Sequence, residues 1–541
     1  MAKSRPWLLW GAGLLLGMAA MGNLFYAQWG PALVEDAYHQ RHAFEWFNSL
    51  IKKQDVHPLE YYQSLGQRAA HNGLLLSVLL VAAVFGLGRA QRRFSATPFL
   101  RGPWLVALGL GLLFASINIL QIPLLQLLPY WFWAQRVKEL PHVWLAVPLG
   151  GVVYVLGRAV LANPQRQARN LALVVLAGFI LQQGFAWMQP SGTASLISRL
   201  LDSIGHRHLA YAAAEHDPLR IPGQYEALLE SEALDAFPHA TRPPGQLLVL
   251  GAVARLAGGS AEALASLGAW LFPLCTYLVI VPLFFLCRLY GDTAFAWAVA
   301  LLYAILPSAT LMTMHLDQWL FPLLGWSAVA LWAYAVERRR ALLATAAGAV
   351  FYLALFTTFS LVALGPLLAL LAWRRRAWVQ VAWAAGGFAL VYLLFWGGLG
   401  YDAGTRYVHA MAAHQQFKIA DWGLGATLYF ACLNLLEFAV WCGVPLAVLA
   451  AYGLRHSLKR ARLENWHDED QTVLALGLLL ILFGLVFLGR TAGEVGRLWL
   501  FLAPLVLMAA AGRALDTRHG VQVLLLAQFF SVVVLRQFQD F

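Results

Sequence analysis

Arginine, histidine and carboxylate side chains gather in three short segments of the chain, at residues 239–245, 314–319 and 489–499. Arginine presents a planar fork of N–H donors that fits phosphate oxygens, whereas carboxylates serve as bases or cation ligands. This combination is typical of sites that hold a phosphorylated ligand. Each segment is therefore a candidate for binding or transferring an anionic substrate.

The first segment is a corner that contains His239 and Arg242. Pro243 and Pro244 fix the backbone and prevent a helix from starting before Gly245. A cation on a rigid corner suits a phosphate group, so we expect His239 and Arg242 to bind one. A plain Pro-Pro turn without a ligand is the alternative.

The second segment places Asp317 at the start of a long apolar stretch, two residues after His315. Ionisable groups at the edge of a membrane helix are costly and usually functional. We therefore expect Asp317 and His315 to bind a substrate head group or a metal ion. A carboxylate that caps the positive end of the helix dipole is the alternative.

The third segment is a glycine-rich turn that carries Arg490, Glu494 and Arg497 into a further apolar stretch. Glycines let a ligand approach the backbone closely, and guanidinium groups match phosphate oxygens. We expect Arg490 and Arg497 to bind a phosphate, with Glu494 beside them at the substrate or metal site. An ion pair between Glu494 and Arg497 is the alternative.

Two further carboxylates, Glu35 and Asp36, follow the first apolar stretch. Adjacent carboxylates at a membrane exit can act as a general base or bind a divalent cation, and a solvated helix end is the alternative. The histidines of residues 188–266 lack the ligand spacing of a zinc site, so no zinc is expected.

The composition determines which elements must position these residues. Of the 541 residues, 60% are hydrophobic and 12% are charged, against roughly 25% charged in soluble domains. These values exclude an ordinary soluble domain and a disordered chain. The net charge of +11 is explained by basic cytoplasmic loops, so no nucleic-acid partner is expected.

The apolar stretches predict an all-α fold, a polytopic bundle of about 15 membrane spans with juxtamembrane helices in its outer loops. The expected spans are 7–27, 73–89, 103–127, 142–160, 170–187, 267–287, 292–311, 316–335, 341–357, 360–373, 377–398, 424–452, 472–489, 496–512 and 520–536.

Charge sets the expected topology. The segment 244–258 is interpreted as a helix lying in the membrane interface, because this places the arginine clusters at 338–340 and 374–376 in the cytoplasm. The N-terminus is then cytoplasmic, the C-terminus is outside, and the long loops, including 188–266, face outward. We expect membrane helices over 1–187, a catalytic core over 188–512 and a last membrane helix in 513–541.

The order of these motifs resembles the GT-C membrane glycosyltransferases, which include protein O-mannosyltransferases and lipid A aminoarabinose transferases. The resemblance covers about 188–512 and rests on the corner Thr241–Gly245, on His315-Leu316-Asp317-Gln318 and on Gly493-Glu494-x-x-Arg497-x-Trp499. An arginine, Arg242, stands where those families often have histidine or lysine before the two prolines.

The resemblance implies a polyprenyl-phosphate sugar donor, a glycan, lipid or protein acceptor, and a site on the outer face of a bacterial inner membrane. It also implies a catalytic carboxylate ahead of the Pro-Pro corner. Asp202 matches the family's spacing to the corner, whereas Glu35 and Asp36 better match the local pattern, so all three stay candidates. A divalent cation, Mg or Mn, is possible, since some GT-C enzymes use one and others do not.

Two other functions are compatible with the sequence. An oligosaccharide ligase or polymerase would also use outer loops and arginines. A lipid or sugar transporter or flippase would need no catalytic base, but transporters tend to carry inverted repeats and charges at the membrane midplane. The chain shows no such repeat.

Overall fold

The computed structural model describes residues 103–541 apart from short gaps at 121–124, 126–127, 129–130, 134, 136, 204–205, 232–233, 235–238, 313, 418–422, 464–469, 488–490, 492, 515–517 and 540–541. The predicted spans 7–27 and 73–89, and the carboxylates Glu35 and Asp36, lie outside the described residues. The chain divides into two compact units, one of residues 1–138 and 533–541 and one of residues 139–532.

The described part of the chain is helical, as expected. Its one extended pairing is an isolated bridge between Gln135 and Gln539. The first unit contains α4 (Pro103–Ile119) and the end of α26 (Arg518–Phe538), a helix that continues from the second unit. The helices that begin the second unit are η2 (Val143–Leu145), α5 (Ala146–Ala162), α6 (Gln167–Trp187), α7 (Ala194–Leu201), α8 (Arg207–Glu215), α9 (Ile221–Glu230) and α11 (Gly245–Ala257).

The second unit continues with long helices and with shorter ones. They are α12 (Ala261–Leu278), α13 (Ile280–Tyr290), α14 (Thr293–Tyr303), α15 (Pro307–Leu311), α16 (Leu316–Arg338), α17 (Ala341–Thr357), η3 (Phe359–Leu364), α18 (Gly365–Arg374), α19 (Trp378–Leu399), α20 (Ala403–Phe417), α21 (Leu424–Cys442), α22 (Val444–Leu463), α23 (Asp470–Phe487), α24 (Val495–Leu498), η4 (Leu500–Leu502) and α25 (Ala503–Ala514).

Seven of the described helical segments are long and apolar enough to cross a membrane, and seven more apolar helices are shorter. The long segments are Val143–Ala162, Gln167–Trp187, Ala261–Tyr290, Gln318–Arg338, Trp378–Leu399, Leu424–Cys442 and Arg518–Phe538. This number is smaller than the predicted 15, because several predicted spans are interrupted and two lie outside the described residues.

Several predicted spans are wrong in their continuity, among them 292–311, 424–452 and 496–512. The stretch 424–452 forms two helices, α21 and α22, that meet at Gly443 with φ of 91°. The Gln528 side chain packs against Gly443 and donates a hydrogen bond to the Cys442 carbonyl at 2.7 Å, satisfying the end of α21. A side chain at position 443 would collide with Gln528, so the break requires glycine.

Small residues let the helices of the second unit approach one another. Gly348 of α17 lies against the Ala384 carbonyl of α19, and Gly387 of α19 lies against the Thr345 carbonyl of α17. A Cβ at either glycine would overlap the facing backbone. Close packing at small residues is how helices associate where lipid removes the hydrophobic driving force.

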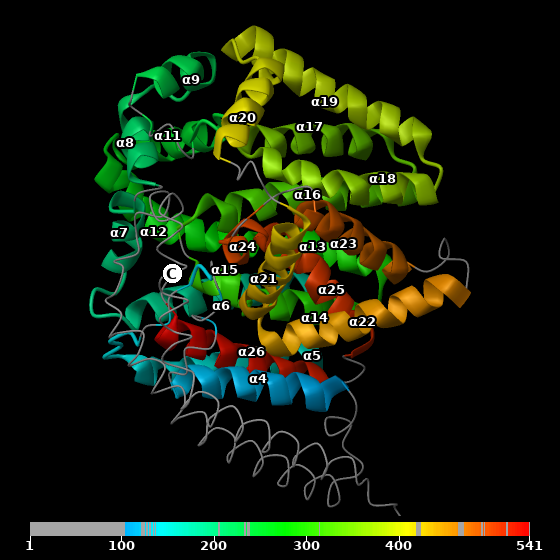
Figure 1. Cartoon of the computed structure of the whole chain (residues 1–541). Coiled ribbons are helices and arrows are strands. Elements are labelled where there is room, and N and C mark those ends of the chain that lie inside the picture. Colours follow the sequence, from blue (N-terminus) through cyan, green and yellow to red (C-terminus); the bar gives the residue numbers. More distant parts are fainter. Residues whose placement is uncertain are drawn as a thin grey trace, which may run out of the picture. The chain divides into compact units, whose positions relative to one another are not determined.

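The short helices α7, α8 and α9 lie at one end of the long helices of the second unit, on the left in Figure 1. Helix α11 starts at Gly245, as the two prolines predict, and packs against α8 and α12. The 188–266 segment therefore covers one end of the bundle, where α16 begins.

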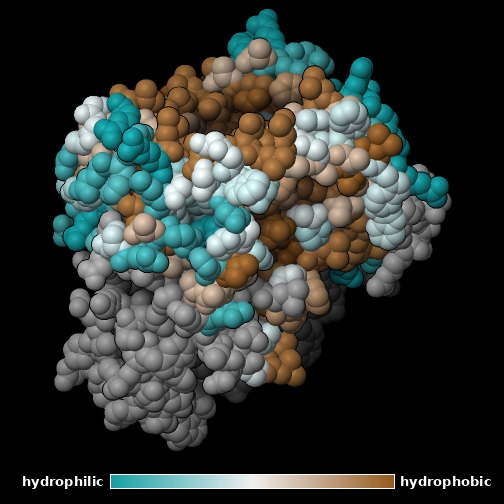
Figure 2. Space-filling view, turned by 90° about the horizontal axis from the view of Figure 1, so that it is seen from above, coloured by the Kyte–Doolittle hydropathy of each residue, from teal (hydrophilic) through white to brown (hydrophobic). Residues whose placement is uncertain are grey.

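An apolar surface separates two hydrophilic regions of the molecule (Figure 2). Helix α19 contributes much of the exposed apolar surface, with Leu390, Leu394 and Trp396 more than half exposed and Trp378 near its other end 61% exposed. Large apolar patches of this kind are unfavourable in water, and tryptophans near both ends of a helix are typical of membrane interfaces. The long apolar helices and this surface indicate a membrane protein.

Candidate functional site

The Pro-Pro corner is attached to the end of α17. Gly245 lies directly against the Phe356 carbonyl, and the Gln246 amide donates to the Thr357 carbonyl at 3.2 Å. Arg242 donates in turn to Gln246 Oε1 at 3.3 Å. The glycine of the motif is thus required by close backbone contact, and the corner has a fixed position that carries Arg242.

His239 is buried at the same corner, with 1% of its surface exposed. Its carbonyl accepts a hydrogen bond from the Tyr225 hydroxyl at 3.2 Å, whereas neither ring nitrogen has a partner among the described residues. Burial, and next the nearby Arg242 and His208, lower the pKa of His239 to about 3. His239 is therefore neutral at physiological pH, and it can offer a phosphate a hydrogen bond but no charge.

Arg406 of α20 holds the corner from the other side. Its side chain is 3% exposed, pairs with Glu226 of α9 at 2.7 Å and donates to the Ala240 carbonyl. The guanidinium also lies 5.7 Å from the Tyr225 ring centre, within cation–π range. Helix α20 is thus docked on the corner, with Arg406 joining α9, α20 and the corner.

His315 stands at the start of α16 as its N-cap residue, immediately after Met314, whose φ is 73°. Its Nδ1 lies 3.1 Å from His206 Nε2 and 3.1 Å from Arg497 Nη1. The two imidazole ring centres are 4.4 Å apart. The predicted head-group residue His315 therefore contacts the predicted phosphate residue Arg497, although 182 positions separate them.

Helix α21 positions the turn that carries Arg497. Asn434 donates to the Thr491 carbonyl at 2.6 Å, and the buried Glu437 accepts from the Gly496 N–H at 2.9 Å. Glu437 is fully buried, because an ionisable group in an apolar helix is costly unless it faces the bundle. Two polar residues one helical turn apart on α21 thus fix the backbone of the turn.

Arg497 also pairs with Glu494, so the predicted alternative for this segment is observed. One arm of the guanidinium, Nη2, contacts the Glu494 carboxylate, and the other, Nη1, contacts His315. Glu494 has a φ of 55° and is, with Met314, one of four described non-glycine residues in the left-handed region. Such residues often occur where function requires an unusual backbone.

Three arginines influence His315 electrostatically. Burial is the first cause that lowers the pKa of His315, followed by His206, Arg497, Arg199 and Arg242. These arginines come from α24, α7 and the Pro-Pro corner, and all three are partly buried. Arg497, which contacts His315, and Arg199 and Arg242, whose charges also act on it, come from sequence segments 43 to almost 300 residues apart. Positive charge beside a neutral imidazole suits an anionic ligand.

Asp202 is the C-cap residue of α7 and lies three residues after Arg199. Its side chain is exposed, and no ion pair or hydrogen bond joins its carboxylate to a described residue. The next residue, Ser203, contacts His206 Nδ1 at 2.9 Å. Asp202 is thus on the same short segment as His206, one residue from the hydrogen-bonded chain that leads to His315.

The structure describes the other predicted site residues only in part or not at all. Asp317 lies in the first turn of α16, as expected for a residue that opens a span, but its side chain lies outside the described part. Arg490, Glu35 and Asp36 also lie outside it. Arg199 carried no local sequence signal, and His206 was considered only as one of several histidines. Their proximity to His315 depends on the packing of the whole bundle.

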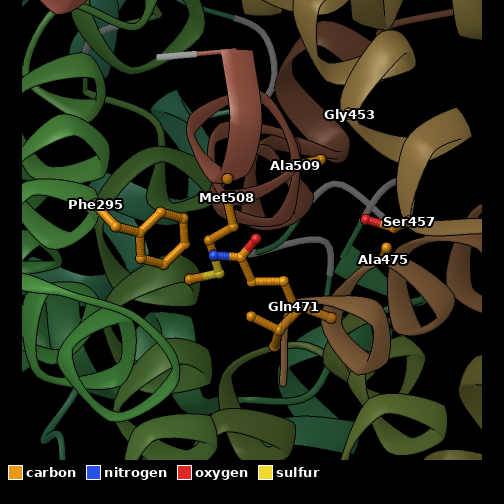
Figure 3. Close-up of a pocket in the computed structure, with 9 residues that line it drawn as sticks. Phe295, Gly453, Ser457, Gln471, Ala475, Met508 and Ala509 are labelled. Carbon is orange, nitrogen blue, oxygen red and sulfur yellow. The ribbon is translucent and has the colours of Figure 1, made fainter. Parts of the chain in front are cut away.

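Metal ligation has no support within the described residues, where no three histidine, cysteine, aspartate or glutamate side chains gather around one point. A small cavity of about 10 Å³ lies elsewhere, between α14, α22, α23 and α25 (Figure 3). Its lining includes Gln471 and Ser457 but none of the predicted site residues. It has room for about one water molecule.

Comparison with known proteins does not identify a relative. No family model matches the chain, and neither a curated protein nor a solved structure matches it.

Proposed function

We propose that this protein is an integral membrane glycosyltransferase of the GT-C type, with the roughly 15 spans that its apolar stretches predict. It moves a sugar from a polyprenyl-phosphate donor to a glycan, lipid or protein acceptor on the outer face of the bacterial inner membrane. The observation that carries the proposal is the contact of Arg497 with His315 at 3.1 Å, with Arg199 and Arg242 close enough to His315 for their charges to help lower its pKa. A lipid phosphate is an anionic ligand that reaches such a cluster from within the bilayer.

The reaction is a single displacement. The acceptor hydroxyl oxygen attacks the anomeric carbon, the bond from that carbon to the phosphate oxygen breaks, and the acceptor proton passes to a carboxylate. Arg242 and Arg497 stabilise the negative charge that gathers on the departing phosphate. Asp202 is our preferred base because it is exposed on the segment beside His206, and Asp36 and Glu35 remain candidates.

The test is transfer of a labelled sugar from a polyprenyl-phosphate donor by the purified full-length protein in nanodiscs. Arg242→Ala and Arg497→Ala should each weaken donor binding by roughly 10- to 100-fold, because charged hydrogen bonds are worth about 1.5–3 kcal/mol. Lysine at these positions should restore part of the affinity, since it keeps the charge but loses the fork. Donor affinity is measured separately from turnover.

The matched control is Arg220→Ala, because the Arg220 side chain is 76% exposed and pairs only loosely with Asp217, at 3.8 Å. It should bind donor as the unsubstituted protein does. Undiminished donor affinity in both Arg242→Ala and Arg497→Ala would contradict the phosphate assignment. Release of whole oligosaccharides in place of single sugars would indicate a ligase, and substrate flux without transfer would indicate a transporter.

A further inference from the structure

The hydrogen bonds around His315 determine which of its nitrogens carries the proton. Arg497 can only donate, so the His315 Nδ1 that it contacts at 3.1 Å must be an unprotonated acceptor. His206 Nε2, also 3.1 Å from this nitrogen, must then donate as well. The two N–H groups share the single lone pair of His315 Nδ1, and an unprotonated His206 Nε2 would place two lone pairs against each other.

The same reasoning extends to Ser203. Because His206 Nε2 carries a proton, a neutral His206 has an unprotonated Nδ1, and this nitrogen accepts from the Ser203 hydroxyl at 2.9 Å. Protons therefore point along the chain in one direction, from Ser203 to His206 and from His206 to His315. The proton positions are deduced in the reverse order, starting from the Arg497 guanidinium, which cannot accept a hydrogen bond.

The remaining nitrogen of His315, Nε2, carries the proton of the neutral ring. It lies on the opposite side of the imidazole from Nδ1, and none of the described residues forms a hydrogen bond with it. His315 keeps part of its surface exposed. The His315 Nε2–H group is thus available as a donor, close to Arg199, Arg242 and Arg497.

We propose that His206 is a positioning residue that, together with Arg497, holds the tautomer of His315, so that His315 Nε2–H donates a hydrogen bond to a phosphate oxygen of the ligand. This inference rests on the proposed function for the identity of the ligand, a polyprenyl phosphate. It assigns to His315 the role of a neutral donor between cations. A neutral donor adds direction to a site whose arginines supply the charge.

The tautomer is measured first, without any substrate. Nitrogen chemical shifts of labelled histidines in the full-length protein distinguish protonated from unprotonated ring nitrogens, and loss of the signal in His315→Gln assigns it. We expect Nδ1 unprotonated and Nε2 protonated at neutral pH. In His206→Leu this preference should weaken, because only Arg497 then donates to His315 Nδ1, whereas His206→Gln should keep it, because the glutamine amide also donates.

Binding of undecaprenyl phosphate is measured in the same variants. Affinity should fall about tenfold in His206→Leu, the value of roughly one hydrogen bond to a charged group, and should largely return in His206→Gln. His142→Leu, at an exposed histidine, is the control for removing an imidazole. A folded His206→Gln protein keeps the test informative if His206→Leu does not fold.

A protonated His315 Nδ1 in the unsubstituted protein would overturn the inference, as would unchanged His315 shifts in His206→Leu. Failure of the proposed function would look different. The protein would then show the assigned tautomer and bind undecaprenyl phosphate, yet transfer no sugar from any donor tested.

Discussion

Asp202 is the described carboxylate whose position best suits a base, because it is exposed and one residue from the Ser203–His206–His315 chain. Asp202→Asn keeps the shape and removes the ability to accept a proton. We expect turnover to fall by 10²- to 10⁴-fold, the usual contribution of a general base, with donor affinity unchanged. Single-turnover sugar transfer and donor binding are measured in parallel.

Asp217→Asn is the control for this substitution, because Asp217 is a half-exposed carboxylate on the same outer segment. It should transfer sugar at the normal rate. If Asp202→Asn also retains normal turnover, Asp36→Asn and Glu35→Gln become the decisive variants. Normal turnover in all three would show that the base lies elsewhere.

His239 should make the fold sensitive to acid. Its pKa is about 3 in the folded chain and near 6.5 in an unfolded one, so the unfolded state gains the proton first as the pH falls. Its neutral form is favoured above pH 6.5, and each pH unit from 6.5 towards 3 should cost about 1.4 kcal/mol. Melting temperatures at pH 7.5 and 5.5 should therefore differ less in His239→Phe than in the unsubstituted protein. An equal difference in both would show that His239 does not contribute.

At the residue scale, the sequence predicted which residues belong to the candidate site better than it predicted which residues they contact. His315, Arg242 and Arg497 were selected from their types and from their places at the edges of apolar stretches, and all three belong to one cluster. Arg199 and His206 carried no local signal, because an arginine in an amphipathic helix and a histidine in a loop are common. Their role depends on contacts across more than 100 positions, which local pattern does not encode.

At the element scale, apolar length predicted where helices form but not where they break. The boundary between α17 and η3 was expected from the basic residues on both sides. The break at Gly443 was not, because the stretch 424–452 is apolar throughout and only the packing of Gln528 shows why a glycine is needed there. The polar residues Asn434 and Glu437 of α21 have partners inside the bundle, as polar groups in an apolar helix require.

The docking of α20 on the corner depends on Arg406. Arg406→Ala leaves Glu226 without its buried partner and the Ala240 carbonyl without a donor. Removing one member of such a pair typically costs about 3–5 kcal/mol, and somewhat less is expected here because Glu226 is 45% exposed. Hydrogen exchange should increase over 403–417 and around 239–242, while α17 and α19 exchange as before. His409→Ala is the control.

His409 also pairs with Glu226, at 3.1 Å, but its side chain is 53% exposed. Its loss should change exchange little, because exposed pairs contribute about 1 kcal/mol or less. Equal protection of α20 in the Arg406→Ala protein and the unsubstituted protein would show that apolar contacts alone, such as those around Tyr401, dock this helix.

At the scale of the whole molecule, α16 links the site to the opposite end of the bundle. His315 is its N-cap residue, and its C-terminal end carries Arg339, which donates to the Arg375 and Arg376 carbonyls. The 23 residues of α16 extend about 34 Å, close to the roughly 30 Å thickness of the bilayer core. The two arginine clusters thus share one end of the bundle, and the His315 cluster lies at the other.

This arrangement predicts the side of the membrane that each end faces. Arginine clusters in short loops stay in the cytoplasm, so the His315 cluster should face outward. If α25 and α26 each cross the membrane, as the sequence predicts, the C-terminus lies outside as well. A C-terminal tag should therefore be accessible to a membrane-impermeant reagent in intact cells. A cysteine replacing Arg340, in a protein lacking its native cysteines, should react only after the cells are opened. A tag protected in intact cells, with the Arg340 position labelled, would reverse the topology and place the proposed transfer reaction in the cytoplasm.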